Sequence, residues 1–482
     1  MDQFFDMNLN REQCYRAIIS RDARFDGRFF VAVSSTGIYC RPVCPSKKPA
    51  LENCEFFRHA AAAEVAGYRP CLRCRPELAP GHAPIDSANQ LATAAMKQIE
   101  AGILGDHGIS AFAMSLGVST RHLRRIFNDN LGVTPIQLAQ THRLLLARQL
   151  LIDTDLPIID VAFASGFSSV RRFNALFLKR YSAAPRALRQ NKRRVTEANA
   201  CACRLSYRTP FDWESLLAFF SRRVFAGVEE VSGGRYRRTV EIGAHRGWIS
   251  VENDTRRSCL RAEVSISLLP VLMQVLARLR RLFDLEALPA EISSRLGSLA
   301  EAHPGLRVPG AFDGFEMAVR AILGQQISVK AATTLAARLT KRFGGAIATP
   351  FPALTHLGPR ADVISKIPLS ELAAIGITQA RAKSIQALAQ AVSTGSLSFD
   401  PAVSIDKALV KFKELPGIGN WTAQYFAMRA LGWPDAFPES DLGILKALGT
   451  KTPSHAASIA EGWRPWRAYA AMHLWKTLKE TP

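Results

Sequence analysis

The sequence has no cysteine after residue 259, so disulfide bonds do not hold its C-terminal half together. It has no run of about 18 apolar residues, which argues against a membrane-spanning helix. It has no low-complexity tract, and its N-terminal segment, MDQFFDMNLNREQCYRA, carries acidic residues early and lacks the apolar core of a secretory signal. We therefore expect a cytoplasmic chain that is folded throughout and has no membrane partner.

The 482 residues are too many for one ordinary core, and their patterns divide into four segments. Residues 1–80 are short elements broken by Gly and Pro, and the linker LAPGHAPIDSAN follows them. Residues 81–193 are mainly helical, residues 204–286 mix helical and strand-like runs, and residues 287–482 are helical again. The sequence therefore predicts a multidomain α+β protein.

The net charge of +21 is shared by both halves of the chain. Residues 1–195 contain 27 Lys and Arg against 16 Asp and Glu, and the remainder contains 35 against 25. Two separately basic halves suggest that both meet a polyanion, and nucleic acid is the partner that this predicts. A basic surface that serves only solubility is the alternative.

Two short cysteine pairs predict a metal site. Cys40 and Cys44 form a C-x3-C pair, Cys71 and Cys74 form a C-x2-C pair, and 26 residues separate the two pairs. Four thiolates at this spacing suit tetrahedral Zn²⁺. The spacing leaves open whether the site is structural or reactive. Four thiolates on one Zn²⁺ carry a net charge of about −2, so a sulfur there can attack an alkyl group on a neighbouring electrophile.

The sequence around these cysteines resembles the N-terminal domain of Ada-type methyl-response regulators, in FVAVSSTGIYCRPVCPSKKPALENCEFF and AGYRPCLRCRPE. The resemblance implies that Cys40 accepts a methyl group from a DNA phosphotriester, while Cys44, Cys71 and Cys74 hold the zinc. Methylation would remove one negative charge facing the DNA and so raise DNA affinity. The candidate phosphate contacts nearby are Arg41, Lys47, Lys48, Arg73 and Arg75.

Two units within residues 81–193 share one plan. ISAFAMSLGVSTRHLRRIFNDNLGVTP places Gly117 in a turn before an amphipathic helix, and IIDVAFASGFSSVRRFNALFLKRYSAAP repeats this 49 residues later with Gly166. Two such units joined by a long helix, here about 136–152, resemble the DNA-binding domain of AraC-type regulators. Two ordinary helical hairpins are the alternative, although the repeated turn followed by Ser and two arginines argues against it.

The resemblance implies that the second helix of each unit enters the major groove of DNA. The residues expected to face inward are Leu123, Ile126, Phe127, Phe173 and Phe177. The candidate DNA contacts are Ser119, Thr120, Arg121, Arg124 and Arg125 in the first unit, and Ser168, Ser169, Arg171 and Arg172 in the second.

The segment ELPGIGNWTAQYFAMRALGWPDAFPESD, residues 414–441, contains a tight glycine turn between two helical patterns. Gly417 and Gly419 form the turn, and Asp441 follows 22 positions after Gly419. A turn of the form L-P-G-I-G joins two helices so closely that larger side chains would clash. Its free backbone N–H groups suit a DNA phosphate, whatever the base sequence of the DNA. Many DNA-binding proteins use such a hairpin without catalysis, so the acid decides the interpretation.

With Asp441, the hairpin resembles the helix-hairpin-helix DNA glycosylases. FDGFEMAVRAILGQQISVKAATTLAARL and WRPWRAYAAMHLW extend the likeness to the 3-methyladenine glycosylase II group, and LSYRTPFDWESLLAFFSRR resembles the opening of that group. The likeness covers nearly all of residues 204–482. It implies that Asp441 stabilises the oxocarbenium charge that develops on the sugar as the glycosidic bond of a flipped, alkylated purine breaks.

Aromatic residues are expected to hold the flipped base. Alkylated purines such as 3-methyladenine are cationic, and electron-rich rings attract cations. The candidates are Trp475, Tyr425 and Trp421, and the resemblance assigns the stacking contact to Trp475. The alternative is that these rings are core residues at helical spacing, which applies most readily to Trp421.

Some features of related families are missing or changed. Asn420 and Trp421 stand where bifunctional glycosylase/lyases carry a lysine, and no C-terminal cysteines exist for an iron–sulfur cluster, so the resemblance implies a monofunctional, metal-free glycosylase that uses water. Gln326 stands where the family often has a leucine wedge, and Glu439 is a rival acid to Asp441. No P-C-H-R motif occurs, so O6-methylguanine methyltransferase activity should be absent.

These features predict four domains: a small zinc-binding domain (1–80), an all-α double helix-turn-helix domain (81–193), an α+β sheet domain (204–286) and an all-α helix-hairpin-helix glycosylase domain (287–482). The predicted function is excision of alkylated purines, fused to a methylation-sensing transcription regulator. The alternative is a regulator whose C-terminal half binds DNA without cutting it. The expected cofactor is zinc, the expected partners are double-stranded DNA and RNA polymerase, and the expected state is a monomer.

Overall fold

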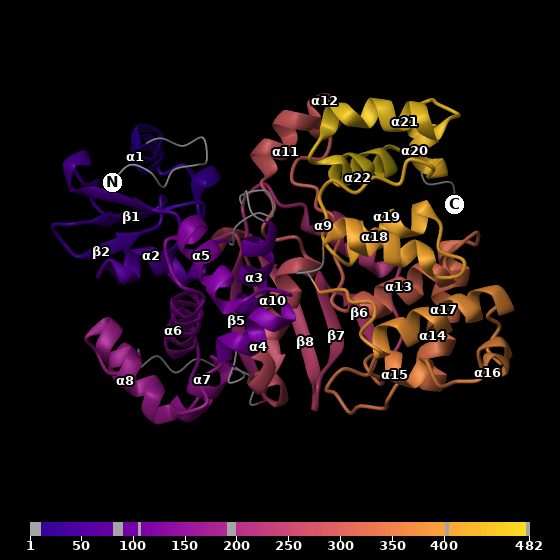
Figure 1. Cartoon of the computed structure of the whole chain (residues 1–482), viewed down its shortest axis with the longest axis horizontal. Coiled ribbons are helices and arrows are strands. Elements are labelled where there is room, and N and C mark those ends of the chain that lie inside the picture. Colours follow the sequence, from indigo (N-terminus) through magenta and orange to yellow (C-terminus); the bar gives the residue numbers. More distant parts are fainter. Residues whose placement is uncertain (1–10, 81–89, 105–107, 190–198, 401–403, 479–482) are drawn as a thin grey trace. The chain divides into compact units, whose positions relative to one another are not determined.

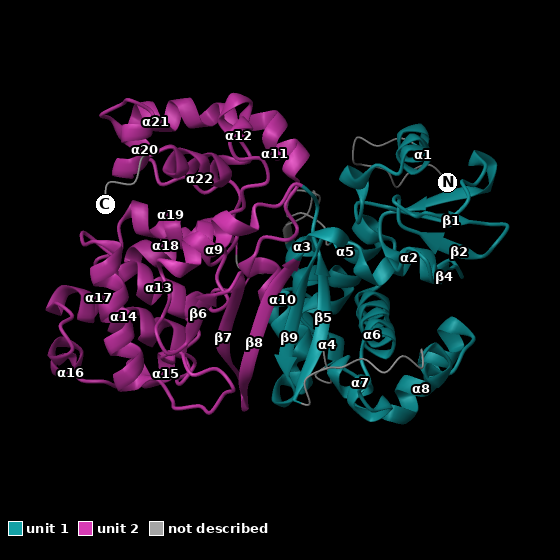
Figure 2. Ribbon diagram, turned by 180° about the vertical axis from the view of Figure 1, so that it is seen from behind, with its two compact units in different colours: residues 1–209, 254–277 teal, residues 210–253, 278–482 magenta. Residues whose placement is uncertain are grey.

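The computed structural model describes residues 11–80, 90–104, 108–189, 199–400 and 404–478 (Figure 1). It forms two compact units, residues 1–209 with 254–277 and residues 210–253 with 278–482 (Figure 2). In the described part of the chain, no helix is both long and apolar enough to cross a membrane. The predicted multidomain α+β class is confirmed. Residues 81–89 of the predicted linker lie outside the described residues.

The first unit begins with a small sheet that carries the cysteine cluster. Its strands follow the order β3-β1-β2-β4, with β1 antiparallel to β2 and β3, and β2 parallel to β4. Apolar side chains such as Phe30 and Tyr39 alternate into its core. The elements are α1 (Arg11–Ser20), β1 (Phe30–Val33), β2 (Ile38–Cys40), β3 (Cys54–Phe57), α2 (Ala60–Val65) and β4 (Arg69–Pro70).

The helical part of the first unit has the predicted double plan. The expected linking helix is α6, which begins with a capping box between Thr134 and Gln137 and has Pro135 at its first position, where no N–H is needed. The five residues expected to face inward are all buried. The helices are α3 (Gln90–Glu100), α4 (Gly108–Ser115), α5 (Thr120–Leu131), α6 (Pro135–Asp153), α7 (Ile158–Ala164) and α8 (Val170–Tyr181).

The segment predicted as one mixed module is divided between the two units. In the first unit, β5 (Ala200–Ser206) pairs antiparallel with β9 (Cys259–Ser265), in a register that places Leu205 opposite Leu260. In the second, β7 (Arg235–Ile242) pairs antiparallel with β6 (Glu229–Ser232) and with β8 (His245–Asp254). Helix α10 (Leu272–Leu282) continues the chain from one unit into the other. The division into four domains stays a prediction.

The second unit is otherwise helical, as expected, and one core cluster packs α13, α17, α18 and α19 around residues such as Phe412 and Phe426. The helices of this unit are α9 (Trp213–Ser221), α11 (Pro289–Leu296), α12 (Ser298–Glu301), α13 (Gly314–Leu323), α14 (Val329–Phe343), α15 (Ala361–Ile364), α16 (Leu369–Ala374), α17 (Gln379–Ser393), α18 (Ile405–Glu414), α19 (Asn420–Arg429), α20 (Leu442–Ala447), α21 (Pro453–Ala460) and α22 (Arg467–Thr477).

Candidate functional sites

The four predicted metal ligands meet in space. Cys40 ends β2 and Cys44 lies in the following turn, while Cys71 and Cys74 lie in the loop after β4. Their sulfur atoms all lie within 4.8 Å of one another, which fits one tetrahedral Zn²⁺ with four thiolate ligands. Cys71 and Cys74 are buried residues, whereas Cys40 and Cys44 are half-buried. The predicted zinc site is therefore confirmed.

Two of the predicted phosphate contacts are instead held in ion pairs. Arg41 is paired with Asp26, and its Nη1 donates to the carbonyl of Cys74 at 3.1 Å. Arg75 lies 2.8 Å from both Glu77 and Asp153. Both arginine side chains are only 14% exposed, so they brace the cysteine loop. Lys47, Lys48 and Arg73 are exposed and remain candidates.

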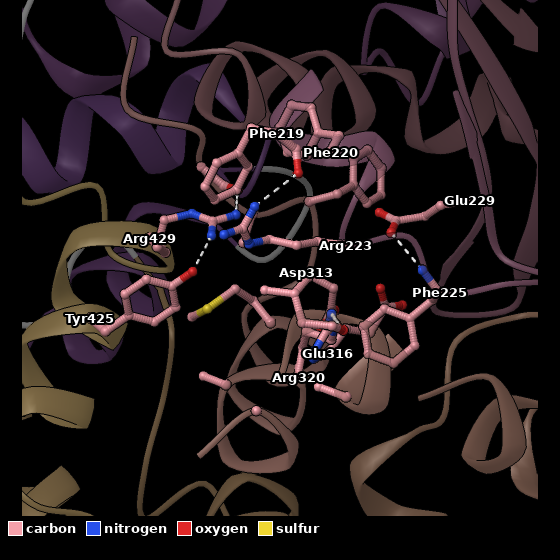
Figure 3. Close-up of a pocket in the computed structure, with 18 of the residues that line it drawn as sticks. Phe219, Phe220, Arg223, Phe225, Glu229, Asp313, Glu316, Arg320, Tyr425 and Arg429 are labelled. Carbon is pink, nitrogen blue, oxygen red and sulfur yellow. Dashed lines mark hydrogen bonds between the residues drawn. The ribbon is translucent and has the colours of Figure 1, made fainter. Parts of the chain in front are cut away.

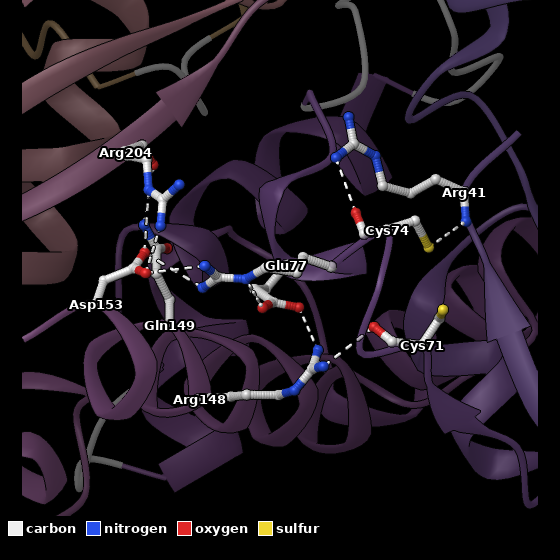
Figure 4. Close-up of polar contacts among 9 residues, drawn as sticks. Arg41, Cys71, Cys74, Glu77, Arg148, Gln149, Asp153 and Arg204 are labelled. Carbon is white, nitrogen blue, oxygen red and sulfur yellow. Dashed lines mark hydrogen bonds and ion pairs between the residues drawn. The ribbon is translucent and has the colours of Figure 1, made fainter. Parts of the chain in front are cut away.

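A buried network that sequence reasoning missed joins the cysteine loop to α6 (Figure 4). Arg148 of α6 is 1% exposed, pairs with Glu77 and donates to the carbonyl of Cys71 at 3.1 Å. One turn further along α6, Asp153 accepts hydrogen bonds from Arg75 and from Arg204 of β5. A buried arginine is stable only when such partners satisfy it, so these contacts anchor the metal site on the linking helix.

The arginines predicted to read DNA lie on the outer faces of two helices. Arg121, Arg124 and Arg125 are exposed on α5, and Arg171 and Arg172 are exposed on α8. The serines predicted beside them have a structural role, because the hydroxyl groups of Ser119 and Ser169 cap α5 and α8 by accepting from backbone N–H groups at 3.2 and 3.3 Å. Gly117 and Gly166 have φ values of +70° and +78° in the expected turns.

The two glycines of the hairpin between α18 and α19 differ in backbone conformation and in the space around them. Gly417 has φ +76°, and a Cβ there would lie 2.4 Å from the Oγ of Ser384, so a larger side chain would clash as expected. At Gly419 the expected clash is wrong, because φ is −84° and a Cβ would meet open space. Gln325 braces the turn by donating to the carbonyl of Gly417 at 3.0 Å.

A cavity of about 400 Å³ in the second unit brings together four residues predicted to form the base site. Trp421 and Tyr425 come from α19, Asp441 precedes α20 and Trp475 lies on α22. The Trp421 and Tyr425 rings stack at 5.2 Å with planes 7° apart, and the Trp475 ring lies 6.4 Å from Tyr425. All three rings are half-buried and line the cavity, and Tyr425 and Trp475 also pack against neighbouring core clusters, so the choice between a base site and a core role stays open.

Asp441 is held in place by three N–H donors. Its Oδ2 accepts from the indole of Trp421 at 2.8 Å, and its Oδ1 accepts from the indole of Trp475 at 2.8 Å. Oδ1 also accepts from the backbone N–H of Ile444 at 3.0 Å, which makes Asp441 the N-cap of α20. These bonds fix the orientation of a carboxylate that lines the cavity.

The same cavity has a cationic side that the sequence analysis did not anticipate (Figure 3). Arg223 and Arg429 both lie over the Phe219 ring, at 4.0 and 4.5 Å, and Arg429 donates to the Tyr425 hydroxyl at 2.6 Å. Burial raises the pKa of Tyr425, but the positive charges of Arg429, Arg223 and Arg320 outweigh it, so the pKa lies below 10.0. Burial lowers the pKa of Arg320 to about 10.

Two predicted residues lie outside this cavity. Gln326 is exposed and has φ +55°, and it is not among the residues that line the cavity wall. Glu439, the rival acid, accepts a hydrogen bond from Asn420 at 2.6 Å and is not a lining residue either. Of the two candidate acids, only Asp441 therefore faces the cavity.

Four family models match successive parts of the chain. They are the metal binding domain of Ada (residues 13–77), a helix-turn-helix domain (112–191), the AlkA N-terminal domain (202–313) and the HhH-GPD superfamily base excision DNA repair protein (319–458).

Three relatives match over different lengths. A Mycobacterium tuberculosis protein named "Probable bifunctional transcriptional activator/DNA repair enzyme AlkA" is 39% identical over 98% of this chain and 97% of its own. The Escherichia coli "DNA-3-methyladenine glycosylase 2" is 36% identical over 57% of this chain and 96% of its own. The Bacillus subtilis "Bifunctional transcriptional activator/DNA repair enzyme AdaA" is 31% identical over 38% of this chain and 85% of its own.

Proposed function

We infer function from the premise that this chain belongs to the family of bifunctional transcriptional activator/DNA repair enzymes, which a 39% identical relative matched over 98% of this chain shows. The protein is a DNA glycosylase for alkylated bases, fused to a methylation-sensing transcription regulator. It binds DNA, and its cofactor is zinc. The assignment of individual residues to these activities is our proposal.

Asp441 is the proposed catalytic residue of the glycosylase. The observation that carries this is its carboxylate in the cavity, oriented by the indoles of Trp421 and Trp475. As the bond between the sugar carbon and the base nitrogen breaks, its electrons leave with the base and positive charge develops on the sugar. The carboxylate stabilises that charge, and water then adds to the sugar carbon and loses a proton to solvent.

The aromatic rings are proposed to hold the flipped base. The stacked rings of Tyr425 and Trp421 form one surface. Trp475 offers another ring, and its indole donates to Oδ1 of Asp441, whereas the Trp421 indole donates to Oδ2. Any damaged base can stack on these rings, because every base has a π face. Gln326, exposed at a turn with positive φ, is proposed to fill the gap that the flipped base leaves in the duplex.

Cys40 is proposed to accept methyl groups from DNA phosphotriesters. Zn²⁺ bound to the four thiolates would keep the sulfurs deprotonated at neutral pH. The sulfur of Cys40 then forms a bond to the methyl carbon, and the carbon–oxygen bond breaks with its electrons passing to the phosphodiester. Exposure alone does not separate Cys40 from Cys44, and the likeness of the surrounding sequence to the metal binding domain of Ada supports Cys40. The arginines of α5 and α8 are proposed to read the DNA.

The glycosylase assignment is tested by release of free methylated purines from methylated duplex DNA. The wild type should release them and Asp441→Asn should not. Release by neither protein would favour the alternative that the second unit only binds DNA. Release by both would move the search for the acid to Glu439.

The sensor assignment is tested by mass spectrometry after incubation with duplex DNA that carries methyl phosphotriesters. A methyl group on the Cys40 peptide is expected, and its absence would make the zinc site purely structural. Contact with RNA polymerase, as a transcription activator needs, and a monomeric state are further proposals. The cytoplasmic location stays a prediction.

A further inference from the structure

The turn between α13 and α14, residues 324–328, is tied to the hairpin between α18 and α19. The side-chain Nε2 of Gln325 donates to the carbonyl of Gly417 at 3.0 Å and to the hydroxyl of Thr422 at 3.1 Å. An amide group has two N–H donors, so each can have its own acceptor here. The acceptors lie 92 and 97 positions further along the chain, so Gln325 joins two parts of the second unit that are distant in sequence.

Helix α17 contacts both the turn and the hairpin. Arg381, in the first turn of α17, donates from Nη2 to the backbone carbonyl of Gln325. Ser384 lies three residues later on the same face of α17, and its Oγ would be 2.4 Å from a Cβ on Gly417. The turn, the hairpin and α17 therefore contact one another in pairs, and none of the three can shift without breaking a contact.

These contacts hold Gln326 in a strained conformation. Gln326 has φ +55°, which a residue with a side chain adopts only at a cost in free energy, so its surroundings must maintain it. The angle φ describes rotation of Gln326 relative to the peptide group that contains the carbonyl of Gln325. Because Arg381 binds that carbonyl, it fixes the peptide group from which the exposed Gln326 side chain projects.

We propose that Gln325 is a positioning residue for base excision, because it holds Gln326 at a fixed distance from the hairpin. This rests on the proposed function, in which Gln326 fills the gap that the flipped base leaves. Phosphate contacts set where a protein sits on DNA, so binding at a hairpin joined rigidly to Gln326 also brings Gln326 to the gap. Gln325 does not line the base cavity, so it acts through Gln326 and not on the base.

The expected effect is confined to damaged DNA. A side chain that is already held in place loses little conformational freedom when it enters the gap, whereas a loosely held one loses more. An intact duplex has no gap, so binding to it does not depend on where Gln326 lies. The preference for damaged over intact DNA therefore measures how well Gln326 is positioned.

The test compares two affinities of the full-length, zinc-loaded protein. One duplex carries a stable abasic-site analogue, in which the gap is already open, and the other is the same duplex without damage. Gln325→Leu keeps the approximate size of the side chain and removes its N–H donors. The matched control is Gln386→Leu, because Gln386 is also half-buried and its Nε2 donates to the backbone carbonyl of Ile367 at 2.8 Å in the same unit.

Gln325→Leu should lower the preference for the abasic duplex about tenfold, which corresponds to the net contribution of one or two hydrogen bonds. Gln386→Leu should keep the wild-type preference. Thr422→Val removes one acceptor of Gln325 from the other side, and Thr422 is only 3% exposed, so DNA does not reach it. This variant should also lower the preference, and its loss should not add to that of Gln325→Leu, because both changes remove the same bond.

Gln326→Ala separates the failure of this proposal from the failure of the proposed function. If Gln326→Ala keeps the wild-type preference, Gln326 does not fill the gap, and its positioning by Gln325 has no role. If Gln326→Ala loses the preference but Gln325→Leu keeps it, gap filling stands and the positioning role of Gln325 is overturned. Equal losses in Gln325→Leu and Gln386→Leu would also overturn it, because they would show a general effect of a lost brace.

Discussion

At the scale of single residues, buried ion pairs shape the base cavity. Arg238 is 3% exposed and lies 2.7 Å from Glu316, and both line the cavity. Burial raises the pKa of Glu316 to about 7, although Arg238 acts in the opposite direction. Glu316 is therefore a group whose charge depends on pH near neutrality.

This pKa predicts a pH dependence of stability. Because the pKa of Glu316 is about 7 in the folded state and 4.5 in the reference state, its stabilising contribution is complete below pH 4.5 and is lost as pH rises through about 7. The loss amounts to about 3 kcal/mol of unfolding free energy. Thermal melting should therefore fall more steeply over this pH range in the wild type than in Glu316→Gln.

Tryptophan fluorescence measures this melting. The control is Glu371→Gln, which removes the exposed partner of Arg342 in the same unit and should keep the wild-type slope. Groups other than Glu316 titrate in the wild type and in the variants alike, so their effects on the melting temperature cancel in the comparison. If Glu316→Gln melted with the same pH slope as the wild type, the raised pKa would be refuted.

At the scale of elements, the two glycines of the hairpin between α18 and α19 have different roles. Gly417 supplies a left-handed φ and space against Ser384, whereas Gly419 occupies an ordinary conformation facing open space. Gly417 therefore serves the fold, and Gly419 leaves room for a ligand to approach the start of α19.

Gly417→Ala should lower the stability of the second unit by about 1–3 kcal/mol, from backbone strain and the contact with Ser384. Gly419→Ala should melt like the wild type but bind duplex DNA more weakly. Melting by tryptophan fluorescence and DNA titration separate the two effects. Equal melting temperatures for the two variants would contradict this division of roles.

The exposed face of α5 gives a prediction on DNA reading. If Arg121 contacts a phosphate, Arg121→Ala should weaken DNA binding and reduce the slope of log affinity against log salt concentration by about 0.9. The matched control is Arg24→Ala, an exposed arginine of the same unit, which should leave the slope unchanged. An unchanged slope in Arg121→Ala would exclude that contact.

Local features could be predicted from the sequence, whereas ion pairs between residues far apart in the chain could not. Cysteine spacing and helical periodicity are local, so they predicted the zinc cluster and the helices around Gly117 and Gly166. The pairing of Arg75 with Asp153 joins residues 78 positions apart, and no local pattern reports such a contact. The clustering of arginines around Tyr425 was missed for the same reason.

At the scale of the whole molecule, residue types divide between the units. All nine cysteines belong to the first unit, and all seven tryptophans belong to the second. Thiol chemistry therefore reports on the sensor, and tryptophan fluorescence reports on the glycosylase. The two proposed reactive residues, Cys40 and Asp441, follow this division, so each reaction should survive the loss of the other.

The most direct test of this account uses Asp441→Asn and Cys40→Ser on one duplex that carries both methylated purines and methyl phosphotriesters. Asparagine can still cap α20 but cannot supply the negative charge, so base release should fall by at least about a hundredfold while Cys40 is still methylated. Cys40→Ser should release bases at the wild-type rate and gain no methyl group at residue 40. Base release by Asp441→Asn at the wild-type rate would contradict the account.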